Sequence, residues 1–298
     1  MEREKEKIIK WIKQHRERLL RPIGKPAKLE PFVIDTEDAE PMKISPRPYS
    51  PMDLAKIKEF VDEGLLNGII RESESPWSVP IVLAAKADGG TCICVDYRAL
   101  NRITKKDTYP LPRIDEPFSQ FHSAWFFSTL DLRSGYWQIA MEESLREKTA
   151  FSTRYGYYEW LVLPFGVSNG PGGFQKHVNR LLTKYVDQFV IVYMDDILIY
   201  SKTLKEHLEH LKIILTALAD ADLILNINKC QFFNTETRFL GQILTCNGCT
   251  PAPRNIEKVI RWPTPEQSPM CTVSTTSRII IGGISKALQP LRFHSPTF

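Results

Sequence analysis

Residues 189–200 read FVIVYMDDILIY, an almost wholly apolar run with two adjacent aspartates, Asp195 and Asp196, at its centre. The run predicts two short strands around the carboxylate pair. Two carboxylates between buried strands cost free energy unless something compensates them, and like charges this close raise the pKa of one of them. A divalent cation would resolve both problems. The alternative is a polar hairpin tip, because aspartate is common in turns.

A third acid, Asp131, has the same character, since it lies within the β-prone stretch WFFSTLDL at 125–132. If this strand lies beside the 189–200 pair, three carboxylates meet at one point. Magnesium prefers oxygen ligands, and two such ions about 3.5–4 Å apart promote in-line displacement at phosphorus. The alternative for Asp131 alone is a strand-end cap.

The rest of the chain alternates helical and strand patterns irregularly, which predicts an α+β fold with a mostly antiparallel sheet. We expect a β-hairpin made of two apolar runs around a Gly-rich turn, and helices where apolar residues recur every three or four positions. The expected helices are 52–64, 174–185 and 204–225, the hairpin is 79–85 with 92–95, and further strands are 125–132 and 239–245.

Composition excludes several classes of protein. The 298 residues are 43% apolar and 25% charged, which argues against wholesale disorder. The net charge of +4 permits an anionic partner without requiring one. No apolar run reaches the roughly 20 residues of a membrane span, and the N-terminus has no apolar signal core. We therefore expect an intracellular chain that is not secreted, with six reduced cysteines.

The N-terminal 52 residues differ in composition from the rest. Residues 1–21 carry eight Lys or Arg against four Glu, which predicts a solvated, loosely attached basic helix, with a membrane-surface helix as the alternative. Residues 22–52 contain seven prolines, which predict an extended connector.

Six strings resemble, in order and spacing, the motifs of reverse transcriptases, and in particular of the gypsy-class (Metaviridae) long-terminal-repeat retrotransposons. They are SESPWSVPIVL (73–83), CVDYRALN (94–101), LDLRSGYWQI (130–139), KTAFSTRYGYYEWLVLPFGVSNGPGGFQ (148–175), YMDD (193–196) and FLGQILTCNG (239–248). The resemblance implies RNA- and DNA-templated DNA synthesis and a right-hand fold. Its implied divisions are a leader and connector (1–45), fingers (46–105 and 139–169), palm (106–138 and 170–245) and a partial, degenerate thumb (246–298).

The resemblance also implies site residues. The catalytic acids are Asp131, Asp195 and Asp196, which with the backbone of Leu132 bind two Mg²⁺ ions, for which Mn²⁺ can substitute. The implied nucleotide-binding residues are Lys86, Tyr136, Phe165, Gly166 and Met194, with Tyr136 excluding a 2′-hydroxyl; the implied template and primer contacts are Trp77, Arg98 and Gln175. The alternatives are core packing for Tyr136 and Phe165, and a solvated side chain for Lys86.

The implied partners are an RNA or DNA template with its primer, dNTPs, and the other domains of a pol polyprotein, namely protease, RNase H and integrase. No membrane is implied. The implied compartment is the cytoplasm, in a virus-like particle, with the nucleus as the alternative. Because 298 residues leave no room for RNase H or integrase, we expect a truncated fragment.

Departures from the family pattern favour an alternative, a catalytically impaired remnant that folds and at most binds nucleic acid. Cys92 stands where the family has a triphosphate-binding arginine, three glycines stand at 170, 172 and 173, and the thumb pattern is faint.

Other signals are weaker. Cys246 and Cys249 form a CxxC pair that favours a turn over zinc, and we expect His207 and His210 on a solvated helix face. Basic and aromatic fingers residues predict a surface that tracks a template strand, with an ordinary charged surface as the alternative. They are Trp77, Tyr97, Arg98, Arg102, Lys105 and Lys106.

Overall fold

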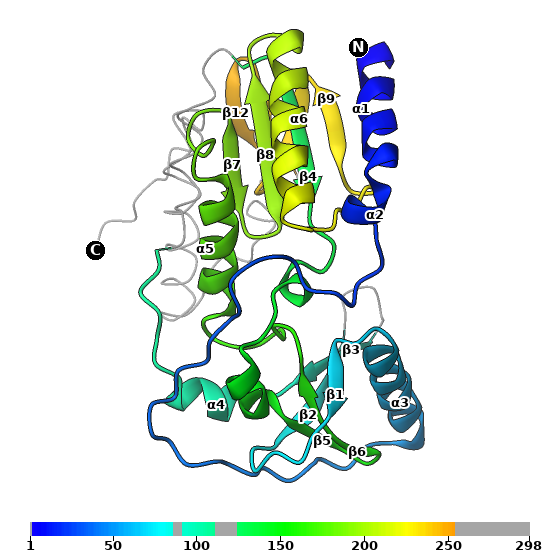
Figure 1. Ribbon diagram of the computed structural model, residues 1–298, viewed down its shortest axis with the longest axis vertical. Coiled ribbons are helices and arrows are strands. Elements are labelled where there is room, and N and C mark those ends of the chain that lie inside the picture. Colours follow the sequence, from blue (N-terminus) through cyan, green and yellow to red (C-terminus); the bar gives the residue numbers. More distant parts are fainter. Residues whose placement is uncertain (1, 86–90, 111–123, 254–298) are drawn as a thin grey trace, which may run out of the picture.

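The computed structural model describes residues 2–85, 91–110 and 124–253. It has the predicted α+β fold with largely antiparallel sheets. Figure 1 shows two bodies. The upper body contains the four-stranded sheet and its helices, and the lower body contains the five-stranded sheet and its helices. One continuous core of buried residues extends through both.

The four-stranded sheet contains the run that opened the sequence analysis. Its strand order is β7-β8-β4-β9, and all neighbouring pairs are antiparallel. Residues 189–200 form two strands around the aspartates, as predicted. The bounds are β4 Phe126–Asp131, β7 Val190–Tyr193, β8 Asp196–Ser201 and β9 Gln231–Asn234.

Both faces of this sheet are covered, which explains its nearly unbroken apolar sequence. Val192 and Ile199 belong to the core shared with helices α5 (Gly170–Leu182) and α6 (Leu204–Asp220). Ile191 and Leu198, which alternate with them along the strands, pack instead with Phe239 from a second, smaller sheet.

That smaller sheet has the order β10-β11-β12, with bounds β10 Glu236–Phe239, β11 Gln242–Thr245 and β12 Gly248–Pro251. The single strand expected over 239–245 is therefore wrong. The backbone turns at Leu240 (φ 48°) and Gly241 (φ 77°), both left-handed, so the stretch is divided between two strands.

Helix α6 begins with a capping box, in which Thr203 and Glu206 each bond to the other's backbone N–H. It ends at Asp220 rather than at 225, because Asp222 takes a left-handed conformation (φ 57°). The solvated face predicted for its histidines is wrong for His207, which is fully buried between Ser128 of β4 and Ser201 of β8.

The five-stranded sheet has the order β1-β6-β5-β2-β3 and one parallel pair, β2 with β5. The predicted hairpin is confirmed as the antiparallel pair β2 and β3. The predicted helix over 52–64 is confirmed as α3, which Ser50 caps. The bounds are α3 Pro51–Leu66, β1 Ile70–Glu72, β2 Val79–Ala85, β3 Thr91–Val95, α4 Arg98–Ile103, β5 Phe151–Thr153 and β6 Gly156–Trp160.

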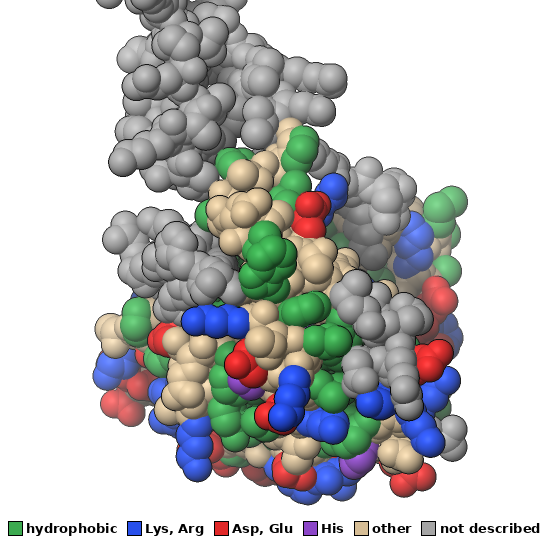
Figure 2. Space-filling view, turned by 90° about the horizontal axis from the view of Figure 1, so that it is seen from above, with side chains coloured by type: hydrophobic (Ala, Val, Ile, Leu, Met, Phe, Trp, Pro, Cys, Tyr) green, Lys and Arg blue, Asp and Glu red, His purple; other side chains and the backbone are tan. Residues whose placement is uncertain are grey.

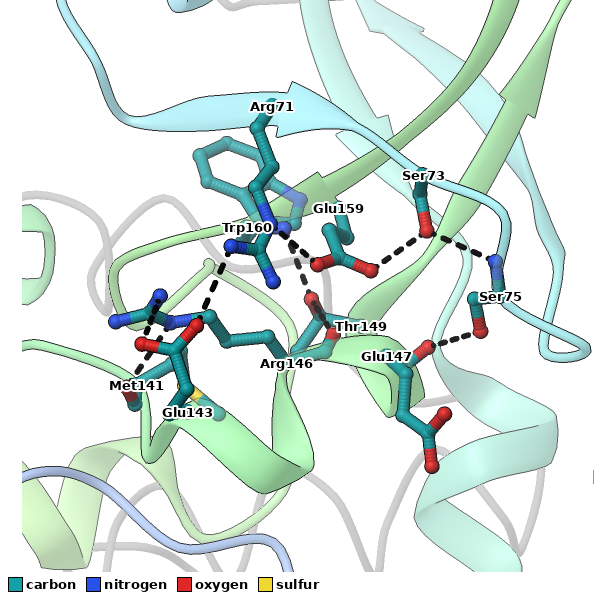
Figure 3. A network of polar contacts seen from close by, with 10 residues as sticks. All are labelled: Arg71, Ser73, Ser75, Met141, Glu143, Arg146, Glu147, Thr149, Glu159 and Trp160. Atoms are coloured by element: carbon teal, nitrogen blue, oxygen red, sulfur yellow. Dashed lines mark hydrogen bonds and ion pairs between the residues drawn. The ribbon is translucent and has the colours of Figure 1, made fainter.

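A polar network links several elements of this lower body (Figure 3). Glu159 of β6 is only 5% exposed, and both of its carboxylate oxygens have donors. Arg71 Nε donates to Oε1 at 2.7 Å and Ser73 Oγ donates to Oε2 at 2.6 Å. Arg71 also reaches Glu143 at the start of the 3₁₀ helix η3 (Glu143–Thr149), so the network joins β1 and β6 to that turn.

The N-terminal helices are packed, which corrects the expectation of a loosely attached leader. Helices α1 (Glu2–Gln14) and α2 (Arg16–Leu19) contact α6, and Ile8, Ile12 and Leu19 are fully buried. Figure 1 shows α1 beside α6 at the upper right. The apolar face of the helix therefore completes the core.

The Pro-rich connector is extended, as predicted, and it joins the two bodies. Phe32 N–H donates to the Ala140 carbonyl, and Ile44 N–H donates to the Ser78 carbonyl. The ring of Phe32 lies against Gly173 of α5, where a Cβ would overlap it. That glycine is thus required by the connector.

The surface carries charges of both signs. Figure 2, which looks down on the top of Figure 1, shows Lys and Arg side chains interspersed with Asp and Glu. Within the described residues, none of the helices combines the length and apolar character needed to cross a bilayer.

Candidate active site

The three aspartates lie at one end of the β4–β8 pair. Asp131 is directly opposite Asp196 in the strand register, and Asp195 precedes Asp196 at the hairpin turn. The Leu132 N–H donates to the Asp195 carbonyl at 3.1 Å, which ties the hairpin to the end of β4. The backbone thus brings together the acids that the sequence analysis singled out.

Negative charge is in excess at this end of the β4–β8 pair. Asp195 Oδ1 is buried and has no hydrogen-bond partner among the described residues. Burial, followed by the charges of Asp131 and Asp196, raises the pKa of Asp195 to about 6. Burial and Asp131 also raise the pKa of Asp196. Lys229 forms an ion pair with one of these acids, and its Nζ lies 3.6 Å from Asp131 Oδ2.

Asp131 and Asp196 also border a cavity of about 210 Å³ between the four-stranded and three-stranded sheets. Its lining includes Lys229, Gln231 and Arg238. The acids are therefore accessible from this side, and two cationic side chains stand near them.

The donor set fits a hard divalent cation, because it consists of carboxylate oxygens with excess negative charge and one partnerless buried oxygen. Across the part of the chain that the structure describes, no three His, Cys, Asp or Glu side chains are already arranged around a common ion position. The acids are neighbours without being a preassembled set of ligands, so an ion would have to draw them together.

Gly135, to which the sequence analysis assigns no role, is part of this site. It begins the 3₁₀ helix η2 (Gly135–Gln138), and a Cβ built there would overlap Asp195 Oδ1 and approach Phe174 to 2.8 Å. Only glycine therefore leaves room for the Asp195 carboxylate. The sequence signal for this role was its position four residues after Asp131.

The side chain of Gln175, which is predicted to contact template or primer, is fully buried. Its Oε1 accepts from the Met194 N–H at 2.7 Å, and its Nε2 donates to the Val192 carbonyl at 2.9 Å. Met194 has a left-handed backbone (φ 52°), which costs free energy in a residue with a side chain. Gln175 thus holds the strained turn that carries the aspartates.

Two further residues extend this anchor. Gln175 Nε2 also donates to Asn179 Oδ1 at 2.9 Å, one turn later on α5, and Asn179 Nδ2 donates to the Tyr109 hydroxyl at 2.9 Å. The sequence analysis missed Asn179 and Tyr109. The available signal was the i, i+4 spacing of two amide side chains on one helix.

The residues predicted to bind the nucleotide are partly brought together. Tyr136 stacks on Phe165 with ring centroids 5.0 Å apart and also contacts the ring of Phe174. Phe165 is 48% exposed, so the stack has an open side. Burial, with a smaller contribution from Asp195, raises the pKa of Tyr136 to about 12, which keeps its hydroxyl protonated.

Gly166 follows in a backbone conformation that favours glycine (φ 95°), and its carbonyl accepts from Asn101 Nδ2 at 2.8 Å. Asn101 Oδ1 in turn accepts from the Ser168 N–H. The turn beside Phe165 is therefore fixed from α4. Lys86 lies outside the described residues.

Of the residues predicted to track a template strand, Trp77 and Tyr97 do not lie at the surface. Their side chains are 3% and 2% exposed and belong to the core. Arg98 is at the surface, where its guanidinium pairs with both carboxylate oxygens of Asp96. This pairing, and a smaller effect of Arg47, lowers the pKa of Asp96 to about 2.

Comparisons with known proteins agree with this geometry. Residues 89–244 match the sequence profile of the family described as reverse transcriptase (RNA-dependent DNA polymerase). The chain is 38% identical over 238 residues to the retrovirus-related Pol polyprotein from transposon 297 of Drosophila melanogaster, and 35% identical over 245 residues to the transposon Tf2-3 polyprotein of Schizosaccharomyces pombe. These alignments cover 78% and 82% of the chain but 22% and 18% of the relatives, so the chain spans about a fifth of their length.

Solved structures share the fold. A foamy viral protease-reverse transcriptase in complex with an RNA/DNA hybrid aligns over 94% of the chain and 38% of its own, with a TM-score of 0.78 and 22% identity. A form of that protein in complex with double-stranded DNA aligns over 94% of the chain and 50% of its own, with a TM-score of 0.83 and 23% identity.

Proposed function

Because this chain belongs to the reverse transcriptase (RNA-dependent DNA polymerase) family, we propose that it extends a primer 3′-hydroxyl with dNTPs on RNA and DNA templates. The observation that carries the proposal is the Asp131–Asp196 pair with the partnerless Asp195 oxygen beside it. The order and spacing of the motifs over residues 73–248 support the gypsy class as the finer assignment.

The parts of the fold are proposed to divide the work as in a right hand. Residues 46–105 and 139–169, which form the five-stranded sheet, are the fingers. Residues 106–138 and 170–245, with the four-stranded sheet, are the palm. Residues from 246 onward begin the thumb; of these, the structure describes those up to 253.

Asp131, Asp195 and Asp196, with the backbone of Leu132, would hold two Mg²⁺ ions, for which Mn²⁺ substitutes. Such ions, when bound, lower the pKa of the attacking hydroxyl and neutralise the leaving pyrophosphate. The chain's own part is positioning: Gly135 leaves room for the Asp195 carboxylate, and Gln175 fixes the turn that presents it.

The stacked pair Tyr136 and Phe165 is proposed to receive the sugar of the incoming dNTP. A ring pair fixed on one side by Phe174 and open on the other can exclude a 2′-hydroxyl by its shape. Gly166 lets the backbone approach the nucleotide closely, Met194 lies beside the primer end, and Lys86 contacts the triphosphate.

Template and primer are the proposed macromolecular partners. The structural relatives bound to an RNA/DNA hybrid and to double-stranded DNA support this assignment. Arg98, exposed on the fingers, is the proposed template contact from this chain. Other domains of a polyprotein are proposed as covalent neighbours, in a cytoplasmic virus-like particle.

Primer extension on matched RNA and DNA templates with Mg²⁺ tests the proposal. The native chain should extend the primer, and Asp195→Asn should not, while primer–template binding persists in both. Absence of extension by a folded, template-binding native chain would refute the proposal unless Cys92→Arg restores extension. If Cys92→Arg restores extension, the polymerase site of the native chain is impaired only at position 92, where the family motif has arginine.

A further inference from the structure

Two thiols on the fingers take no part in the proposed polymerase reaction, although one of them, Cys92, stands where the family motif has arginine. Cys92 and Cys94 lie on β3, and their Sγ atoms are 3.5 Å apart. Both side chains are partly exposed, and both cysteines are free. A pair of thiols in contact, rather than a single cysteine, calls for a chemical explanation.

The strand geometry accounts for the contact. Side chains two residues apart on a strand project from the same face, so Cys92 and Cys94 are neighbours there. Ile93 and Val95, which alternate with them, pack with the core. The thiols therefore project from the opposite face of β3, which is the edge strand of the five-stranded sheet. Ala84, directly opposite Cys92 on β2, is exposed, so this face is open to solvent.

The spacing disfavours a disulfide. Two residues of extended strand separate the Cα atoms by roughly 6.4–6.8 Å, at the upper limit of the disulfide range. The strand would have to contract, although its pairing with β2 holds both cysteines in register.

The same spacing suits a bridging ion. With metal–sulfur bonds of about 2.3 Å and a tetrahedral angle, two thiolates on one ion lie roughly 3.8 Å apart. The two sulfurs need to move by only a few tenths of an ångström to reach that separation.

We propose that Cys92 and Cys94 form a two-thiolate binding site for a thiophilic divalent cation of the Zn²⁺ and Cd²⁺ class. On binding, two S–H bonds break, two metal–sulfur bonds form, and two protons pass to solvent without any electron transfer. Within the described residues no third His, Cys, Asp or Glu completes the set, so the two thiolates are the ligands on which the proposal rests.

Cd²⁺ titration of the reduced full-length chain tests this site, because thiolate-to-cadmium charge transfer gives an ultraviolet band that carboxylates do not produce. Cys246→Ser/Cys249→Ser serves as the parent, since it removes the other closely spaced thiol pair. The parent should bind one equivalent with the absorbance of two thiolates. Adding Cys92→Ser or Cys94→Ser should weaken binding at least tenfold and remove the band.

Cys92→Arg is the second variant, because arginine is the residue that the family motif has there. It should also abolish the band, with an unchanged circular dichroism spectrum showing that the chain is folded. An equal band in the parent and in the folded Cys92 variants would overturn the proposal. So would a reduced parent that gives no band, whether or not air then produces a Cys92–Cys94 disulfide. The readout is independent of primer extension, so it stands or fails apart from the polymerase proposal.

Discussion

Two acids in this molecule, the buried Glu159 and the half-buried Asp195, have opposite surroundings. Glu159, in the lower body, has a donor on each carboxylate oxygen, one from Arg71 and one from Ser73. Asp195, at the β7–β8 hairpin, has one oxygen without a hydrogen-bond partner among the described residues and two further carboxylates beside it. A buried charge is tolerated when it is paired, and it is costly when it is not.

This difference in surroundings indicates that Glu159 contributes to stability, whereas Asp195 contributes to function. The Glu159 network stabilises the fold, because each carboxylate oxygen accepts a hydrogen bond and Arg71 balances the charge. Around Asp195 the fold keeps an uncompensated charge that a cation can satisfy. Variants of the two acids should accordingly have opposite effects on activity and on stability.

The largest effect is expected for Asp195→Asn. It should lower primer extension by about a thousandfold or more, because a metal-binding carboxylate is lost. It should also raise the melting temperature of the metal-free chain, since burial and like-charge repulsion no longer destabilise that position. Paired extension and thermal melting assays check both, and a lower melting temperature in Asp195→Asn would contradict the comparison.

Gly135→Ala should have the next largest effect. Its methyl group would occupy the space of Asp195 Oδ1, so the carboxylate must shift, and extension should fall by about a hundredfold. Gly172→Ala is the matched control, because a Cβ there comes no closer than 3.9 Å to its neighbours. That variant should keep full activity and gain up to about 1 kcal/mol of stability. Equal losses in both variants would mean that the space at Gly135 is not what matters.

Gln175→Leu should act on the same acid through the turn. It removes the acceptor of the Met194 N–H and the donor to Val192 without adding charge. We expect kcat to fall about tenfold with little change in the KM for dNTP, because Gln175 is buried and acts by positioning the turn. Steady-state kinetics at saturating template would show the split, and a change confined to KM would argue for a direct contact instead.

Glu159→Gln tests the other side of the comparison. It keeps the shape but replaces a charge-assisted pair, so the free energy of unfolding should fall by about 1–3 kcal/mol while extension per folded molecule stays unchanged. Urea unfolding and active-site-normalised extension measure the two quantities. A loss of activity that exceeds the loss of folded protein would give Glu159 a role in the reaction.

The smallest effect is expected from pH. Burial, with His210 nearby, lowers the pKa of His207 from 6.5 to about 3 in the folded chain. Between these values the unfolded chain binds more protons, so the stability present above pH 6.5 is lost as the pH falls, by about 1 kcal/mol per pH unit. Urea unfolding at pH 7 and pH 5 should show a steeper dependence in the native chain than in His207→Gln. Equal slopes would exclude His207 as the cause.

The central sheet and its acids could be predicted because their signals are local and strong. A doubly covered strand pair needs a continuous apolar run, and aspartates at the ends of such runs stand out. Asp131 lies opposite Asp196 because Asp131 ends β4 and Asp196 begins β8, and these two strands pair in antiparallel register.

Other features depended on partners far away in the sequence. His207 has polar neighbours on its own helix, but the serines that bury it come from β4 and β8. Gln175 and Trp77 were assigned to surfaces because nothing local reveals which face of an element is covered. Gly173 is a departure from the family pattern whose reason is not local: the ring of Phe32, 141 positions earlier, lies against it.

The packing of α1 against α6 has a consequence for how the chain folds. Ile8 and Ile12 can pack against α6 only after residues 204–220 have been synthesised, roughly 10–40 s later at the usual rate of translation. During that interval the first helix leaves the ribosome with its apolar stripe exposed. Docking α1 on α6 closes the long loop of chain between them, which costs conformational entropy. We therefore expect the N-terminal segment to dock late and to bind chaperones before it does.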